Sequence, residues 1–228
     1  MRYLISAFLL FSLLLLNSCK KNTPLADSNV WLPQELKTLF LFYPGTYWVF
    51  EELNTGFEDS IFVTKTVLDT VPILHPGSKE VIGQKERFVV TCISPFYGIE
   101  FEIASESPNF CYQLGPGAPC HFIAQRHIRN NAVSDRSLIY FFPEEVGKAW
   151  PTENNGISYE TMLIDSIWPS FDLAGNTYSQ VRSIQLSLDP TLQYRSSLRR
   201  VAPGVGIIQR KVDAMGWNWV VKRYNVVQ

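Results

Sequence analysis

The sequence predicts a mostly β protein: an antiparallel sandwich or a half-open barrel, with one short helix near the N-terminus. From Thr46 onward, about eleven short runs of aromatic and β-branched residues follow one another, separated by turns rich in Gly, Pro and Asn. Strands do not alternate with helices along these runs, so a Rossmann-type cofactor site is not expected. The chain is 14% aromatic and 18% charged, as is typical of a protein that buries a core.

The first 18 residues are predicted to be a signal peptide. Met1 and Arg2 are followed by an apolar run over 3–16, which is shorter than the roughly 20 residues that span a bilayer. The run ends in the motif LNSC at 16–19, where a thiol directly follows a small residue. This combination of a basic start, a short apolar run and a final Cys resembles the lipobox of bacterial lipoproteins.

The resemblance to lipoproteins implies a covalent lipid on Cys19. In that family the Cys sulfur receives a diacylglyceryl group, cleavage precedes the Cys, and the new amine is acylated, commonly with palmitate. Two or more acyl chains hold a protein stably on a membrane without a transmembrane helix. We therefore expect residues 1–18 to be removed and 19–32 to be a lipidated tether. The alternatives are a plain secretory signal with an incidental Cys, and an uncleaved anchor.

The remaining chain is long enough for one β domain, over 33–228. Removal of the leader takes away Arg2 and leaves 19 basic against 21 acidic residues, a net charge of −2. Because nucleic-acid binding calls for a basic surplus, no nucleic-acid partner is expected. The residues predict no oligomeric state and no cofactor besides the lipid on Cys19.

Three cysteines remain if Cys19 carries lipid. Cys111 and Cys120 flank a segment whose Gly-Pro-Gly at 115–117 is a strong turn signal. A turn there would bring the two thiols onto neighbouring strands, so a Cys111–Cys120 disulfide is one interpretation, with Cys92 as a small buried apolar residue. Free buried thiols throughout are the other, and both stay open at this stage.

The first folded element is predicted to be a helix over 33–42. Proline suits the first helical position, and Leu36, Leu39 and Phe40 recur at the spacing of one helix face. A hairpin follows, with strands over 47–51 and 60–66 around a turn at 54–56. The other predicted strands cover residues 87–93, 98–104, 120–128, 138–142, 158–167, 178–188, 198–202, 206–212 and 217–225.

Several blocks are similar to uncharacterised lipoproteins of Bacteroidetes-type bacteria. They are YPGTYWVFEELNTGFEDSIFV from Tyr43, GNTYSQV from Gly175, VAPGVGIIQRKV from Val201 and WNWVVKRYNV from Trp217. The resemblance implies an envelope lipoprotein with no known activity. Surface-exported members of that phylum carry acidic residues after the lipidated Cys, whereas Lys20-Lys21-Asn22 stands here. We therefore expect an outer-membrane protein that faces the periplasm.

Three segments that could be taken for a phosphate loop, a zinc site or a catalytic carboxylate pair are better explained by ordinary strand and turn structure. The Ala-Pro-Gly-Val-Gly segment at 202–206 precedes an alternating strand and not a helix, so we predict a turn or bulge instead of a phosphate loop. His121 and His127 would be roughly 20 Å apart on one strand, too far for one zinc ion, and are expected to be partly exposed. Glu100 and Glu102 share a strand face at about 6 to 7 Å, and a solvated face opposite apolar residues explains them.

Aromatic side chains are the remaining indication of function. Trp217 and Trp219 share one predicted strand face and Tyr47 lies on another strand. Core packing explains most aromatic residues, and contact of these three rings with a ligand is the alternative interpretation. We therefore expect non-catalytic binding of an apolar ligand or an envelope protein by a membrane-anchored lipoprotein. The alternatives are a glycan- or peptide-processing envelope enzyme, with Glu100 and Glu102 as the first candidates, and a structural or assembly role.

Overall fold

The computed structural model describes residues 29–75, 77–95, 99–106, 121–129, 132–142, 144–147, 149–154, 158–187 and 197–228. The chain divides into two compact units. The first contains residues 1–30 and 72–85, and the second contains residues 31–71 and 86–228. The sheet core and the candidate site described below belong to the second unit.

In the first unit, the short segment at Val30 pairs with a hairpin. The N–H of Val30 donates to the carbonyl of Gln84 at 2.8 Å, and the N–H of Gln84 donates to Oδ1 of Asn29 at 2.9 Å. The hairpin turn is closed by the N–H of His75, which donates to the carbonyl of Glu80 at 2.8 Å. These contacts fix Asn29 and Val30, which lie within the predicted tether, against the hairpin.

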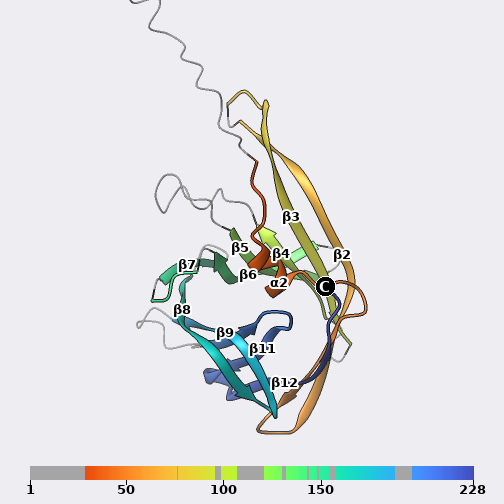
Figure 1. Ribbon diagram of the computed structural model, residues 1–228, viewed down its shortest axis with the longest axis vertical. Coiled ribbons are helices and arrows are strands. Elements are labelled where there is room, and N and C mark those ends of the chain that lie inside the picture. Colours follow the sequence, from red (N-terminus) through yellow and green to blue (C-terminus); the bar gives the residue numbers. More distant parts are fainter. Residues whose placement is uncertain are drawn as a thin grey trace, which may run out of the picture. The chain divides into compact units, whose positions relative to one another are not determined.

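The described residues form one α-helix, one 3-10 helix and twelve strands (Figure 1). The helix α2 covers Gln34–Phe40, and the 3-10 helix η2 covers Asp213–Met215. The strands are β1 (Tyr47–Glu52), β2 (Phe57–Leu74), β3 (Val81–Ser94), β4 (Ile99–Glu106), β5 (His121–Arg129), β6 (Ala132–Phe142), β7 (Ala149–Asn154), β8 (Ser158–Leu173), β9 (Asn176–Ser187), β10 (Ser197–Ala202), β11 (Gly206–Val212) and β12 (Trp217–Asn225).

All twelve strands belong to one antiparallel sheet of order β6-β5-β4-β3-β2-β1-β12-β11-β10-β9-β8-β7. Consecutive strands pair with each other within β1–β6 and within β7–β12, which gives two meanders. The pairing of β1 with β12 joins the two meanders into one sheet. The edge strands β6 and β7 contact each other, so the sheet is nearly closed into a barrel. The prediction of a mostly β fold with one short helix is confirmed, in its half-open barrel form and not as a sandwich.

Strand β7 was not predicted, and its sequence AWPTEN explains why. Pro151 in its middle cannot donate a ladder hydrogen bond, which argues against a strand in general. β7 pairs only with β8 and forms one edge of the sheet, the position where proline is tolerated. The strands β2, β3 and β8 are also longer than expected, with 18, 14 and 16 residues.

The helix α2 depends on tertiary packing for its stability. It has seven residues, fewer than an isolated helix needs in water. Leu36, Leu39 and Phe40 are fully buried, as their spacing predicted, and the following Leu41 and Phe42 are buried in the same core. This segment therefore fills part of the space that the curled sheet surrounds.

The turn between β10 and β11 clamps this segment. The N–H of Gly204 donates to the carbonyl of Thr38 in α2 at 2.9 Å, and Nε1–H of Trp48 in β1 donates to the carbonyl of Val205 at 2.6 Å. The ring of Phe42 meets that of Trp48 edge to face, with centroids 5.0 Å apart. The segment at 202–206 is thus the predicted turn between strands, and it ties the helix to the sheet.

A buried polar cluster connects the edge strand β6 to β9. The hydroxyl of Tyr140 in β6 donates to Glu144, which lies between β6 and β7, and Nε of Arg182 in β9 donates to Oε1 of Glu144 at 2.8 Å. Burial and the nearby Glu144 carboxylate both raise the pKa of Tyr140. The ring of Tyr140 also contacts that of Phe40, at 5.2 Å between centroids, so the cluster reaches α2.

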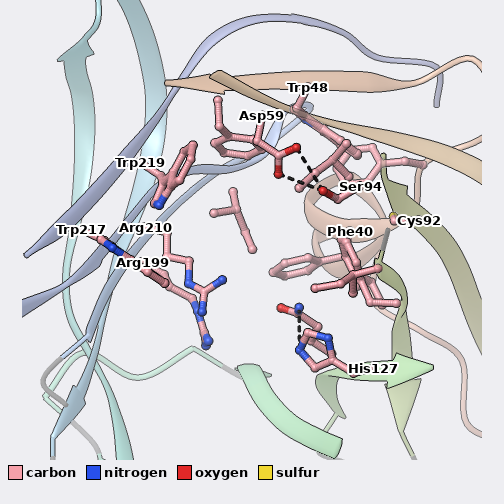
Figure 2. Close-up of a pocket in the computed structure, with 18 residues that line it drawn as sticks. Phe40, Trp48, Asp59, Cys92, Ser94, His127, Arg199, Arg210, Trp217 and Trp219 are labelled. Atoms are coloured by element: carbon pink, nitrogen blue, oxygen red, sulfur yellow. Dashed lines mark hydrogen bonds between the residues drawn. The ribbon is translucent and has the colours of Figure 1, made fainter. Parts of the chain in front are cut away.

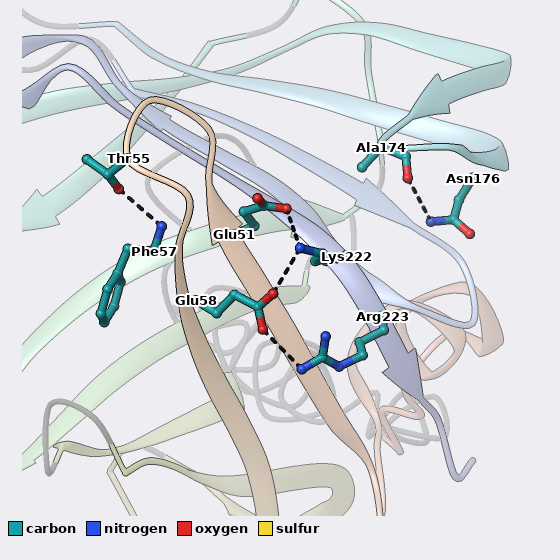
Figure 3. Close-up of polar contacts among 8 residues, drawn as sticks. All are labelled: Glu51, Thr55, Phe57, Glu58, Ala174, Asn176, Lys222 and Arg223. Atoms are coloured by element: carbon teal, nitrogen blue, oxygen red, sulfur yellow. Dashed lines mark hydrogen bonds and ion pairs between the residues drawn. The ribbon is translucent and has the colours of Figure 1, made fainter.

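The outer face of β1, β2 and β12 carries a network of ion pairs (Figure 3). Lys222 lies 3.1 Å from Glu51 and 2.9 Å from Glu58, and Arg223 lies 3.0 Å from Glu58. The pairing of β1 with β12 skips Lys222, a bulge that leaves Lys222 and Arg223 both exposed on this face. Because such exposed pairs are screened by water and salt, they contribute little to stability, and they keep this face solvated.

Glu52 is a buried carboxylate that organises the turn between β1 and β2. It accepts hydrogen bonds from the N–H groups of Asn54, Thr55 and Asn218, at 3.1, 2.8 and 3.1 Å, and from the Thr55 hydroxyl at 2.8 Å. Loss of water raises the pKa of Glu52, but these hydrogen bonds lower it more, so the net effect is a lowered pKa. The carboxylate joins the start of β12 to the first hairpin.

We predict that Gly206→Ala strongly destabilises the protein. Gly206 has a φ of +87°, and a Cβ there would lie 3.0 Å from two ring atoms of Phe42. The left-handed backbone costs about 1–2 kcal/mol and the overpacking a further 1–3 kcal/mol. The matched control is Gly175→Ala, where φ is +80° and no atom lies within 4 Å of the added Cβ. Urea unfolding should show a larger loss in the free energy of unfolding for Gly206→Ala than for Gly175→Ala. Equal losses would contradict the close packing of the β10–β11 turn against Phe42.

We also predict that Glu52 makes the fold acid-sensitive. Because its pKa is lowered in the folded state, its stabilisation is complete above its ordinary pKa of 4.5 and disappears as the pH falls through the folded value. The melting temperature of Glu52→Gln should be below that of the wild type at neutral pH, and the gap should narrow in acid. Glu51→Gln, one residue away on the outer face, serves as the control. A gap that stays constant with pH would refute the role of the Glu52 charge.

Candidate functional site: a cavity inside the sheet

The second unit contains a cavity of about 330 Å³ on the inner side of the sheet. That volume is at the lower end of the roughly 300–1,000 Å³ of small-molecule sites. Eighteen described residues line it, and Figure 2 shows them. They come from α2 and the residues after it and from β1, β2, β3, β4, β5, β10, β11 and β12, so distant parts of the chain build one wall.

One end of the cavity is deep and the other opens to solvent. Phe40 and Cys92 in its lining are fully buried, and Trp48 and Phe50 of β1 are nearly so. In contrast, the side chain of Trp217 is 42% exposed. The lining therefore combines solvent-exposed residues, among them Trp217 and Ile99, with a buried apolar part that contains Phe40 and Cys92.

The predicted ligand-facing aromatics divide between the two faces of the sheet. Trp217 and Trp219 line the cavity, and the ring of Trp219 also contacts that of Phe57, at 5.9 Å between centroids. Tyr47 is not one of the lining residues, because its ring packs against Phe62 of β2, at 6.1 Å. Its neighbour Trp48 lines the cavity in its place.

Two arginines project into this apolar lining. Arg199 of β10 and Arg210 of β11 are direct partners across the two strands, and Figure 2 shows both side chains entering the space between the tryptophans and Phe40. Arg199 is only 7% exposed, whereas Arg210 is exposed. The positive charge therefore extends from the surface to a buried part of the cavity wall.

A β-bulge explains why the sequence pattern did not indicate Arg210. The register of β10 with β11 pairs Arg200 with Gln209 and Val201 with Ile207, so Ile208 is skipped. Beyond the skipped residue the alternation of faces is shifted by one, and Ile207 and Arg210 both line the cavity. For Arg199 a signal did exist, because it shares a face with the buried Val201 in the alternation of β10.

One carboxylate is present among the described lining residues. Asp59 of β2 is buried, and the hydroxyl of Ser94 in β3 donates to it, at 3.0 Å from each carboxylate oxygen. The N–H of Ser60 also donates to Oδ1 of Asp59, at 2.8 Å. These donors compensate the buried charge of Asp59 within the wall itself.

The two histidines considered as metal ligands lie in different surroundings. His127 lines the cavity, beside Gln125 at 3.4 Å and the ring of Phe101. His121 is buried at 4% exposure, and burial lowers its pKa, so the expectation of a partly exposed side chain was wrong for His121. Within the described ranges, no group of three or more metal-binding side chains comes together.

The paired carboxylates of β4 lie on the other face of the sheet. Phe101 and Ile103 line the cavity, while Glu100 is exposed and Glu102 lies 3.8 Å from Arg126. The predicted alternation of β4 is confirmed. Glu100 and Glu102 are not among the residues that line the cavity.

Cys92 is a free, buried cysteine in the cavity lining, as expected for a small apolar residue. Burial raises the pKa of its thiol to about 12, so very little thiolate forms at neutral pH. Such a thiol packs as an apolar group and does not act as a nucleophile. The lipid site Cys19 and the pair Cys111 and Cys120 lie outside the described residues, so their lipidation and pairing stay predictions.

Among the described residues, no helix is long and apolar enough to cross a membrane. Comparison of the chain with known protein families, with curated proteins and with solved structures finds no match. The similarity to Bacteroidetes-type lipoproteins therefore stays an expectation from the sequence blocks. The residues that line the cavity are therefore the basis of the function proposed below.

Proposed function

We propose that this protein is a lipid-anchored envelope lipoprotein whose β domain binds an apolar ligand without catalysis. The observation that carries the proposal is the cavity of about 330 Å³ between the sheet and the α2 segment. Apolar and aromatic side chains make up most of its lining, with a few polar groups among them. This is the composition of sites that bind small molecules by removing apolar surface from water.

The lipid anchor is the second part of the proposal and rests on the LNSC motif at 16–19. A diacylglyceryl group and an acyl chain on Cys19 would hold the domain at the membrane surface. Lys20 and Lys21 suit the periplasmic face of the outer membrane, as the resemblance implies. A binding domain at that place meets the apolar molecules of the envelope directly.

The cavity favours binding over the enzyme alternative. Glu100 and Glu102, the carboxylates that motivated a glycan- or peptide-processing enzyme, do not line the cavity. Cys92, which does line it, is held as a neutral thiol by its raised pKa of about 12. We therefore propose a binding protein, with the cavity as its site.

Binding is tested with the neutral fluorophore N-phenylnaphthylamine and the full chain in phosphatidylcholine nanodiscs, with empty nanodiscs as the reference. We expect saturable binding to the wild type. Ile61→Trp should weaken it at least about tenfold, because the added ring occupies cavity volume. The control is Phe62→Trp, since Phe62 is the next residue of β2, 40% exposed and not part of the lining. Equal binding by both variants, or no saturable binding, would refute the site.

The anchor is tested by replacing Cys19. We expect the wild type to sediment with membranes and to carry acyl mass on Cys19, and the Cys19→Ala variant to lose both. Cell fractionation and intact-mass analysis measure these two properties. If the wild-type N-terminus carries no acyl group, the assignment as a lipoprotein is wrong, whatever the outcome of the binding experiment.

A further inference from the structure

The arginine pair in the cavity narrows the class of ligand. Arg199 and Arg210 face each other across β10 and β11, and like charges placed directly opposite destabilise a strand pair. Repulsion is stronger near an apolar wall than in water, because the local dielectric is lower. An anionic head group between the two guanidinium groups would be attracted by both positive charges.

The guanidinium group is well suited to such an anion. Its planar set of donors matches the oxygens of carboxylate and phosphate groups, and it keeps its charge at any physiological pH. Arg199 is only 7% exposed, so water competes little for hydrogen bonds between its guanidinium group and a bound anion. Arg210 is exposed and stands where a charged head group could remain partly hydrated.

The rest of the lining sets the requirements for the remainder of the ligand. Trp48, Phe50 and Ile207 offer apolar surface in the same cavity. The volume of about 330 Å³ is roughly twice that of a cavity that holds one benzene molecule, which suits one apolar chain better than two. Asp59, the carboxylate in the wall, is engaged by Ser94 and lies apart from the arginines in Figure 2.

We propose that the ligand is a single-chain anionic amphipath, whose carboxylate or phosphate head is bound by Arg199 and Arg210 and whose chain occupies the apolar cavity. This inference rests on the proposed function, since it concerns the same cavity. It assigns a specificity to the cavity: charged single-chain lipids are preferred over neutral ones of the same chain length.

The test is competition against bound N-phenylnaphthylamine by lauric acid, monododecyl phosphate and dodecanol, which share one chain and differ in the head group. We use the full chain in phosphatidylcholine nanodiscs and correct for partition with empty nanodiscs. The wild type should bind at least one of the two anions about tenfold more tightly than dodecanol. The better of the two anions identifies the head group as carboxylate or phosphate.

Arg199→Gln and Arg210→Gln should each reduce, by about tenfold, the ratio of the affinity for the anion to the affinity for dodecanol, both measured on the same variant. Lys211→Gln removes the same charge from the neighbouring position, where the side chain pairs with Asp213 and does not line the cavity, and should leave the anion's affinity unaltered. If Arg199→Gln fails to fold, the measurement on Arg210→Gln decides, because Arg210 is exposed.

Two results would overturn the inference. One is equal affinity of the wild type for dodecanol and for both anions; the other is a preference for anions that survives both arginine substitutions. Either result with intact fluorophore binding leaves the proposed function standing, because the cavity would then bind neutral apolar molecules. Loss of fluorophore binding in the wild type itself would instead refute the proposed function.

Discussion

The structure depends on the packing of the α2 segment inside the curled sheet. A barrel of about eight strands is filled by its own side chains, and wider ones enclose additional space. Twelve strands form this sheet, and Leu36, Leu39 and Phe42 of the inserted segment occupy part of the interior. The seven-residue helix is too short to persist alone. Sheet and helix therefore stabilise each other, and the turn between β10 and β11 joins them.

The same constraint produces the candidate site. Phe40 and Phe42 of the inserted segment form part of the cavity lining, so the space that the helix leaves unfilled is the space a ligand would enter. The turn that clamps the helix also continues into β10 and β11, the strands that carry Arg199 and Arg210. One turn thus links the core to the candidate site: a change that displaces it would alter both the core and the charged wall of the cavity.

Sequence reasoning predicted the helix and eleven of the twelve described strands, because hydrophobic periodicity and turn residues are local signals, but it left open whether the sheet forms a sandwich or a half-open barrel. The position of a strand within the sheet is not a local signal. β7 was not predicted because it contains Pro151, and a strand tolerates proline at this place only at the edge of a sheet. In β1, aromatic residues point to both faces, so the pattern could not choose Trp48 over Tyr47 as the cavity residue. Arg210 was missed because the bulge at Ile208 reverses the alternation, and bulges depend on strand pairing.

The central claim is that the β10–β11 turn holds the helix segment inside the sheet. Hydrogen exchange of the tryptophan indole groups, followed by NMR, tests it most directly. The Nε1–H of Trp48 donates to Val205 in a buried contact, so it should exchange at least about a thousandfold more slowly than that of the exposed Trp217. Exchange of both indoles at similar rates would show that the segment is not held there, and would contradict the account.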